Sequence, residues 1–550
     1  LPETLAQPTL AAKQATSAEA KAIKALVALF DGAKTFGSLI TVPDAVMQSL
    51  PLLDALLAKP LTGDLLLRQA QEDAQEALKP LVEQARLLGG RYDCVVANPP
   101  YMGGKGMNAD LKAFAGKRYP DSKADLFAVF IERNLELAAH HGSVAMITMQ
   151  SWMFLSSYEK LRLKLLANET LASMAHLGGR GFDSIGGEVV STTAFVIKNN
   201  HMADFKGGYL RLIEGISEAA KQSDFKQAIA NHSSGSFFRA SASDFEKIPG
   251  SPIAYWASPA TRTAFETLPK IGDFAQAKSG QNTGDNARFL RNWFEVEFSK
   301  IGFGYKSLQE TKKSGHRWYP YNKGGAFRKW YGNFESVINW KSDGEEVKAY
   351  AVERNGGSHW SRYIQNIDFM MREGVTWTFI SSSYMGARYT PAGHLFDYAG
   401  CSAFTSKEYL HTLIASMCSK TSEFFLKFTN PTLNLQPGNV SGLPVPLDNI
   451  DSDRLTANVE NLIDISKIDW DLGECSWDFV LFALLDSTCV APSLEVAYRN
   501  FVTQSWRLVD RTKAYEEENN RILIEAYGLT SELSNSIDLG LVTLTCNPHY

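Results

Sequence analysis

One tetrapeptide, Asn98-Pro99-Pro100-Tyr101, combines residue types that suit a specific kind of chemistry. The side-chain carbonyl of Asn98 and the backbone carbonyl of Pro99 can accept both hydrogens of a planar exocyclic amine. The lone pair of such an amine is delocalised into its ring, and two acceptors would localise it for attack on an electrophile. Tyr101 offers a face on which an extruded base can stack. The four residues therefore predict activation of a ring amine, with no metal and no covalent enzyme intermediate.

The alternative interpretation of this tetrapeptide is a tight turn, because Asn-Pro commonly starts one. Its surroundings favour the chemical interpretation. The run YDCVVA at 92–97 reads as a strand that the prolines must end, and an amphipathic helix and a second strand follow. Asn430-Pro431 and Asn547-Pro548 lack the second proline, the tyrosine and this context, so we interpret both as turns.

The elements around the motif alternate between strand and helix. We expect a helix over 122–142 with Ser122 and Asp125 in a capping arrangement, a strand over 142–150 and a helix over 155–168. Two more strand-like runs follow, at 171–178 and 189–198. This order predicts an α/β fold with a Rossmann-like sheet, partial in this chain, mostly parallel and covered on both faces. Ligands of such sheets lie at the carboxyl ends of strands, where the motif is.

Changes in composition predict four regions along the chain. Residues 1–90 are rich in Ala, Leu, Lys, Glu and Gln and predict helices, whereas 91–200 form the catalytic core. Residues 201–446, with many aromatics, Gly, Ser and Asn, predict a mixed α+β target-recognition domain. Residues 447–550 return to a helical pattern and predict a helical C-terminal module.

The chain has 550 residues and a formal net charge of -5, so any contact with nucleic acid requires a locally basic surface. Its six cysteines are scattered without a CxxC pair, which argues against a zinc site and a disulfide framework and favours a reducing cytoplasm. No apolar stretch approaches the roughly 20 residues of a membrane span. We therefore expect a cytoplasmic protein with no metal and no membrane contact.

Basic and aromatic residues interleave between residues 277 and 388, which predicts a surface that contacts double-stranded DNA. The alternative is that the aromatics, such as Trp318, Tyr321 and Trp340, form the core of a β-rich domain. We expect DNA contacts from the following residues of this region: Gln281, Thr283, Arg288, Arg317, Lys323, Arg328 and Arg388.

The tetrapeptide resembles the catalytic motif of S-adenosylmethionine-dependent methyltransferases that act on planar exocyclic nitrogens, chiefly N6 of adenine. Further segments, among them QNTGDNARFLRNW, NPTLNLQPGNVSGLPVP and EEENNRILIEAYGL, resemble the adenine-specific DNA methyltransferases of BREX phage-defence systems. The resemblance extends from about residue 91 to the end. It implies S-adenosylmethionine as cofactor, methylation of a flipped adenine in a short DNA site, and other BREX proteins as partners. Asn98, Pro99, Pro100 and Tyr101 would then be catalytic, with Asn98 also at the cofactor.

One element of that class is missing, because nothing in residues 1–90 matches a glycine-rich cofactor loop. We interpret the chain as the later portion of a longer protein, and expect these residues alone to bind S-adenosylmethionine poorly. Three alternatives stay open. The chain could be the methyltransferase-specificity part of a single-chain restriction-modification enzyme, a methyltransferase for glutamine side chains or RNA, or a non-catalytic DNA-binding specificity subunit.

Overall fold

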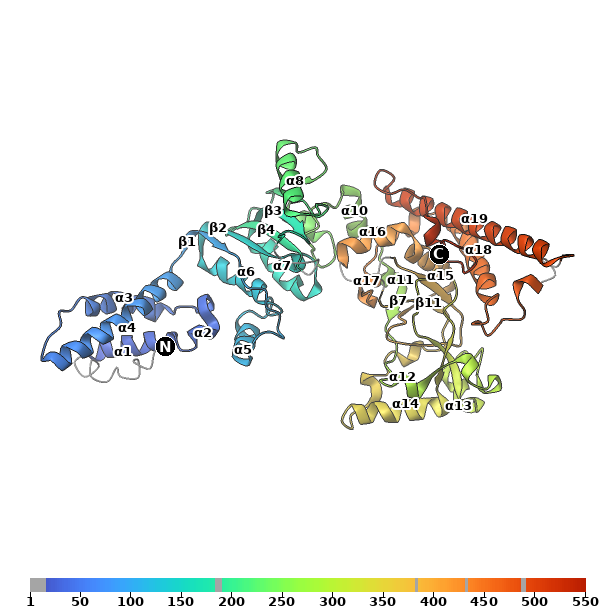
Figure 1. Cartoon of the computed structure of the whole chain (residues 1–550), viewed down its shortest axis with the longest axis horizontal. Helices are drawn as coiled ribbons and strands as arrows, with labels where there is room; N and C mark the ends of the chain where they lie inside the picture. The colour runs from blue at the N-terminus through green and yellow to red at the C-terminus, as the bar shows by residue number, and fades with distance from the viewer. Residues whose placement is uncertain (1–15, 184–189, 381–383, 431–433, 486–490) are drawn as a thin grey trace. The chain divides into compact units, whose positions relative to one another are not determined.

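The computed structural model describes residues 16–183, 190–380, 384–430, 434–485 and 491–550. The chain divides into two compact units (Figure 1). The first reaches Glu246 and includes Gly250–Trp256, and the second comprises Lys247–Pro249 and Ala257–Tyr550. Within the described residues no single helix is long and apolar enough to cross a membrane; one pair, Ala33–Leu39 with Asp44–Leu57, passes that test jointly but is bent by 104°.

The first unit begins with helices that pack on one another, as residues 1–90 predict. They are α1 (Ser17–Leu29), α2 (Ala33–Phe36), α3 (Asp44–Leu57) and α4 (Leu65–Gly89), with the 3-10 turn η3 (Gly37–Leu39). Their shared core contains Leu26, Leu50 and Val82. Side chains cap two of these helices at their N-termini. Thr16 and Glu19 form a capping box at α1, and the carboxylate of Asp64 accepts the N–H of Leu67 at α4.

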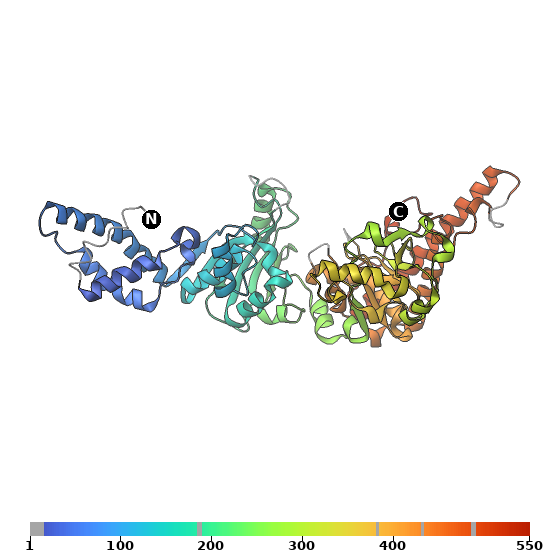
Figure 2. The same ribbon diagram turned by 90° about the horizontal axis from the view of Figure 1, so that it is seen from below.

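A six-stranded sheet follows, with strand order β1-β2-β4-β3-β5-β6 (Figures 1 and 2). The strands are β1 (Tyr92–Ala97), β2 (Ala138–Met149), β3 (Thr170–Gly178), β4 (Thr192–Lys198), β5 (Gly207–Arg211) and β6 (Phe237–Ala240). The α/β class is confirmed, but the expected mostly parallel sheet is wrong. Only β1–β2 and β3–β5 are parallel, while β4 is antiparallel to both of its neighbours and β6 to β5.

Helices between the strands pack on this sheet. They are α6 (Leu126–Leu137), α7 (Glu159–Asn168), α8 (Glu218–Ala230) and α9 (Ala242–Glu246), with 3-10 turns η4 (Gln150–Met153) and η5 (Ser156–Tyr158). The helix α5 (Ala109–Arg118) packs instead against α6 and α2. Phe127 of α6, Leu161 of α7 and Val144 of β2 share one core. Asp125, not Ser122, is the N-cap of α6, because Ser122 donates its hydroxyl hydrogen to Glu132 instead. The predicted boundary at residue 200 also shifts, since β5 and β6 belong to the same sheet as β1.

The second unit contains two four-stranded sheets, with orders β13-β9-β10-β8 and β12-β11-β14-β7. Their strands are β7 (Ala275–Lys278), β8 (Leu290–Asn292), β9 (Trp318–Asn322), β10 (Ser336–Asn339), β11 (Gly374–Trp377), β12 (Ala387–Thr390), β13 (Leu395–Phe396) and β14 (Ser402–Thr405). The helices among them are α10 (Pro259–Thr267), α11 (Ile271–Phe274), α12 (Asn286–Phe289), α13 (Leu308–Ser314), α14 (Lys341–Arg354), α15 (Lys407–Cys418), α16 (Lys420–Thr429) and α17 (Pro437–Ser441). The expected mixed α+β architecture is confirmed.

Two long helices, α18 (Ser452–Asp471) and α19 (Leu494–Tyr527), pack on each other in the C-terminal region of the second unit. The helical prediction for this region is confirmed. The region packs on the preceding β-rich part, because α18 contacts α15 and Glu516 of α19 binds Lys329. Residues 257–550 therefore form one unit with a shared interior.

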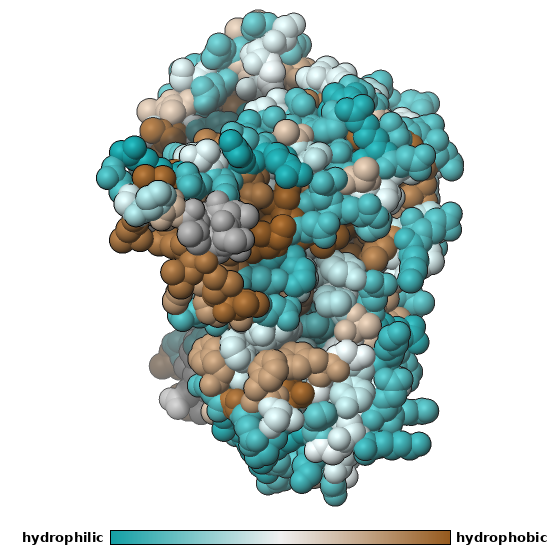
Figure 3. Space-filling view, turned by 90° about the vertical axis from the view of Figure 1, so that its right-hand side faces the viewer, coloured by the Kyte–Doolittle hydropathy of each residue, from teal (hydrophilic) through white to brown (hydrophobic). Residues whose placement is uncertain are grey.

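The surface of the second unit is not uniformly polar. Figure 3 shows hydrophobic residues gathered on one face of the second unit. The exposed large apolar side chains of this unit include Val480, Phe482, Leu485 and Leu494.

Candidate active site

The Asn98–Tyr101 motif lies where the sequence places it, directly after β1. The parallel register pairs Ala97 of β1 with Met146 of β2, so the motif emerges beside the carboxyl end of β2. Pro99 is buried, whereas Asn98 and Pro100 are exposed. Among the described residues the carboxamide of Asn98 has no hydrogen-bond partner. Its oxygen is free to accept a hydrogen from a substrate.

Tyr101 is half-buried, and one edge contact fixes its ring. The ring meets Phe127 of α6 edge to face, with ring centroids 6.2 Å apart and planes at 86°. Burial raises the pKa of Tyr101, so its phenol stays neutral at physiological pH. A neutral aromatic ring held by its neighbour on one side is a suitable stacking platform for a planar base.

The loop is fastened immediately after Tyr101. The carboxylate of Asp125 accepts the N–H of Met102 at 2.9 Å and the N–H of Phe127 at 3.3 Å. The backbone adds a second tie, because Leu126 donates its N–H to the carbonyl of Met102 at 3.0 Å. The end of the motif is thus joined to the first turn of α6.

The other side of β1 is open. β1 is an edge strand, and the side chain of Val96 is 75% exposed although Val95 and Ala97 pack against the core of the sheet. Strands in parallel pairs normally have apolar cover on both faces. One face and one edge of the strand that carries the motif therefore lack cover from the described residues.

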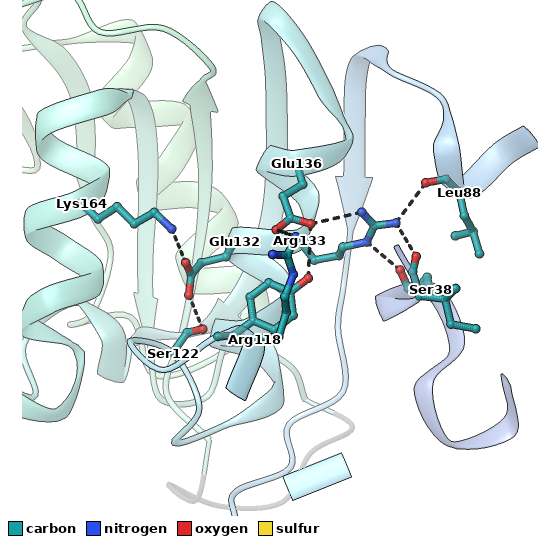
Figure 4. Close-up of polar contacts among 10 residues, drawn as sticks. Ser38, Leu88, Arg118, Ser122, Glu132, Arg133, Glu136 and Lys164 are labelled. Atoms are coloured by element: carbon teal, nitrogen blue, oxygen red, sulfur yellow. Dashed lines mark hydrogen bonds and ion pairs between the residues drawn. The ribbon is translucent and has the colours of Figure 1, made fainter. Parts of the chain in front are cut away.

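A buried arginine connects α6 to the N-terminal helices (Figure 4). The guanidinium of Arg133, which is 1% exposed, donates to the carbonyls of Ser38 at 2.9 Å, Ile40 at 2.8 Å and Leu88 at 3.1 Å. It also lies 3.3 Å from the carboxylate of Glu136. The preceding residue, Glu132, accepts from Ser122 at 2.6 Å and from Lys164 of α7 at 2.5 Å. α6 is thereby anchored from several sides.

Polar groups also meet near the carboxyl ends of the neighbouring strands. His176 of β3 is buried between the hydroxyl of Tyr255 at 3.0 Å and the Oε1 of Gln150 at 2.7 Å. Gln150 offers an acceptor, so Nε2 carries the hydrogen and Nδ1 accepts from Tyr255. Burial lowers the pKa of His176 to about 4, with Arg211 and Lys221 acting in the same direction. The imidazole is therefore a neutral structural group at pH 7.

The structure separates the expected DNA-binding residues into buried and surface groups. Arg328 is buried, and its guanidinium bonds the carboxylate of Asp469 at 2.7 Å, Thr545 Oγ1 at 3.0 Å and the carbonyl of Tyr331 at 2.9 Å. The expectation that Arg328 contacts phosphate is wrong, because its donors serve the contact between the β-rich part and the C-terminal helices. The next residue, Lys329, binds Glu516 of α19, which also accepts from Trp330 Nε1.

Arg388, Gln281 and Thr283 are also interior residues, so their expected DNA contacts are wrong as well. Burial lowers the pKa of Arg388 to about 10. Thr283 donates to Asn286 Oδ1 at 2.6 Å, and Gln281 lies opposite Asp397 in an isolated bridge. The aromatics of this region, among them Tyr321, are core, as the alternative interpretation holds.

Three predicted residues remain at or near the surface of the second unit. Arg288 pairs with Glu346 at 3.0 Å, and Arg317 is exposed over the ring of Trp318. Lys323 is half-buried. Within the described ranges no carboxylate lies at ion-pair distance from Arg317 or Lys323, so both cations are available. Three exposed lysines near the motif in the chain were not among the residues expected to contact DNA: Lys105, Lys112 and Lys123.

The chain matches the family profile of the Eco57I restriction-modification methylase over residues 53–182, a range that contains the motif. It is 40% identical over 518 residues to the adenine-specific methyltransferase PglX of Lacticaseibacillus casei (strain Zhang), covering 92% of this chain and 42% of that protein. It is 39% identical over 544 residues to the adenine-specific methyltransferase BrxX of Escherichia coli O9:H4 (strain HS), covering 97% of this chain and 42% of that protein. The chain is therefore similar to these adenine-specific methyltransferases over almost all of its own length. The resemblance expected from the sequence is confirmed.

The chain spans about two fifths of the length of PglX and BrxX. Among solved structures, the Type IIL restriction-modification enzyme MmeI in complex with DNA aligns with a TM-score of 0.46 and 10% identity, covering 83% of this chain and 56% of that chain.

The residues present fit the methyl acceptor of a methyl transfer but not the methyl donor. Asn98 and Tyr101 suit the methyl acceptor, since a free carboxamide and a stacking face are what a ring amine requires. The described residues before β1 are helical and contain no glycine-rich turn after a strand. The described residues therefore do not fit the adenosine and methionine parts of a methyl donor. The described residues also contain no group of three metal-binding side chains.

Proposed function

We propose that this chain is the acceptor-binding and DNA-binding part of an S-adenosylmethionine-dependent, adenine-specific DNA methyltransferase that acts in a BREX-type phage-defence system. The observation that carries the proposal is the geometry of the Asn98–Tyr101 loop. It lies at the carboxyl end of a strand, with a free carboxamide and a supported aromatic ring. The sequence identity to the adenine-specific methyltransferases PglX and BrxX supports adenine as the proposed target.

The chain's own residues account for the activation of the amine. Asn98 Oδ1 and the carbonyl of Pro99 accept the two N6 hydrogens, which favours a pyramidal nitrogen with a localised lone pair. Tyr101 stacks on the flipped adenine, worth about 1 to 3 kcal/mol, and offsets much of the cost of extrusion. S-adenosylmethionine, when bound, supplies the electrophilic methyl group.

The open edge of β1 supports a role within a larger protein. The uncovered Val96 and the free edge favour further strands and helices that would complete the sheet beside the motif. Such elements would hold the donor, which fits the greater length of PglX and BrxX. We place the whole protein in the cytoplasm, which the scattered cysteines favour.

DNA contact by the second unit rests on its surface cations. Arg317 and Lys323 can neutralise phosphates, whereas the buried Arg328 and Arg388 cannot without unfolding their surroundings. The recognition of particular bases depends on groove geometry and DNA shape.

The test is sequencing for N6-methyladenine in DNA from cells that express the natural full-length protein with its neighbouring genes. We expect methylation at one short site and its loss in Asn98→Ala. A matched control is Asn108→Ala, which removes the N-cap of α5 outside the motif and should leave methylation intact. Absence of methylation in the wild type would favour a non-catalytic DNA-binding specificity subunit. Methylation retained in Asn98→Ala would refute the role of Asn98.

A further inference from the structure

The Asn98–Tyr101 loop has two ends, and these ends determine where its acceptors point. At the first end, β1 pairs with β2 in register up to Ala97. Among the described residues no hydrogen bond holds the carboxamide of Asn98, and the prolines stiffen the chain between Asn98 and Tyr101. The position of the loop therefore depends on its second end, at Met102.

One side chain, the carboxylate of Asp125, and two backbone hydrogen bonds hold that second end. Asp125 accepts the N–H of Met102 at 2.9 Å and, with the same Oδ1, the N–H of Phe127 in the first turn of α6. Two backbone bonds run beside it, from Leu126 to Met102 at 3.0 Å and from Gly104 to Ala124 at 3.2 Å. We propose that Asp125 is a positioning residue that aligns the Asn98–Tyr101 loop for reaction by joining Met102 to α6. This inference rests on the proposed function and deepens it.

The role of Asp125 differs from that of an ordinary helix cap because α6 does not depend on it for its place. Arg133 fixes α6 to three carbonyls of the N-terminal helices, and Glu132 fixes it to Lys164 (Figure 4). Removal of the Asp125 carboxylate therefore leaves the helix in position and frees the N–H of Met102. The loop, and not the helix, moves.

A small movement of the loop is enough to matter for catalysis. Tyr101 directly precedes Met102, and its ring is aligned by the edge contact with Phe127 of the same helix. A misplacement of about 1 Å between reacting groups can lower a rate about 100-fold. The proposed phosphate contacts of Arg317 and Lys323 do not involve this loop end. The expected signature is a lower kcat with an unchanged KM for DNA.

The experiment uses the natural full-length protein with Asp125→Ala, Asp125→Asn and the control Asp64→Ala. Asn keeps an acceptor oxygen at the same place and is an equally good cap. Asp64 is also an N-cap, since it accepts the N–H of Leu67 in α4, but it is exposed and far in sequence from the motif. Three quantities are measured: kcat and KM for methylation of a DNA duplex, the thermal midpoint, and hydrogen–deuterium exchange in a peptide covering 98–108.

We expect Asp125→Ala to lower kcat at least about tenfold with KM for DNA within twofold, and to speed exchange at Met102. Asp125→Asn should restore kcat and the slow exchange at Met102. Asp64→Ala should leave kcat and this exchange unchanged, while it lowers the thermal midpoint by about as much as Asp125→Ala does. Unchanged kcat in Asp125→Ala beside an active wild type overturns the inference and leaves the proposed function intact. If the wild type does not methylate DNA, the proposed function fails. Unchanged exchange at Met102 in Asp125→Ala would separately refute the role of the Asp125 carboxylate in holding Met102.

Discussion

The substitution Arg328→Met tests whether this arginine holds the second unit together or binds DNA. The side chain is 4% exposed and that of its partner Asp469 is 1% exposed. Removing one partner of a buried, hydrogen-bonded ion pair typically costs about 3 to 5 kcal/mol. Asp469 keeps two other donors, the N–H groups of Thr545 at 2.7 Å and Cys546 at 2.9 Å, so its charge stays partly satisfied. We therefore expect a loss near the lower limit, about 3 kcal/mol.

The matched control is Arg317→Met, the same substitution at an exposed guanidinium in the same unit. It should change the free energy of unfolding by less than about 0.5 kcal/mol. The assay is hydrogen–deuterium exchange of peptides from 323–335 and 465–471 in increasing urea, which reports the stability of this unit alone. The salt dependence of DNA binding is measured in parallel.

The two variants should show opposite effects. Arg317→Met should lower the slope of log K against log salt by about one, whereas Arg328→Met should leave that slope unchanged in the folded fraction. If Arg328→Met left stability within about 0.5 kcal/mol of the wild type and reduced the salt slope, Arg328 would be a DNA contact and the structural assignment would be refuted.

Further predictions concern the motif, the surface and pH. Asn98→Ala should abolish methyl transfer and leave the dissociation constant for DNA within about twofold, because it removes an acceptor and no phosphate contact, as a filter-binding assay would reveal. Lys323→Ala should weaken DNA binding uniformly across sequences and reduce the salt slope by about one, and an unchanged slope would exclude a phosphate contact. His176 has a pKa of about 4 in the folded state, below its ordinary value of 6.5, so the unfolded state takes up a proton first as pH falls. Its contribution to the free energy of unfolding is therefore full above pH 6.5 and is lost as pH falls from 6.5 towards 4. Urea unfolding of the first unit should show a loss of up to about 3 kcal/mol over that range, and His176→Gln should flatten it.

The motif and the fold class were predictable from sequence because local rules determine them. Two prolines must end a strand wherever they occur, so the end of β1 at Ala97 follows from residues 92–101. The end of α6 does not follow from its own sequence. The helix stops at Leu137, short of the expected Gly142, and the carboxamide of Asn199 donates to the carbonyls of Ala138 and Ala139 at 3.0 Å and 3.1 Å. A residue about 60 positions away takes up those groups and favours the early start of β2.

The same distinction explains why the DNA-binding residues were only partly predictable. Arg317 and Arg328 have similar neighbours, each beside aromatics in a basic stretch, and local pattern assigns both to a surface. Arg328 is interior because Asp469, 141 residues later, lies 2.7 Å from its guanidinium. Glu516 buries Lys329 in the same way from 187 residues away. Charge patterns in one chain segment thus cannot separate phosphate contacts from buried pairs whose partners come from another segment.

One of the segments that resemble BREX methyltransferases has a packing role. The EEENN run at 516–520 binds inward: Glu516 accepts from Lys329 and Trp330, Asn519 from Asn458, and Asn520 from the N–H of Lys420. The run therefore serves the contact between α19 and the rest of the second unit. A segment can mark a family because the arrangement of its domains needs it, while the chemistry rests elsewhere. In this chain the groups suited to a ring amine occupy one loop of the first unit, whereas the EEENN run serves packing within the second.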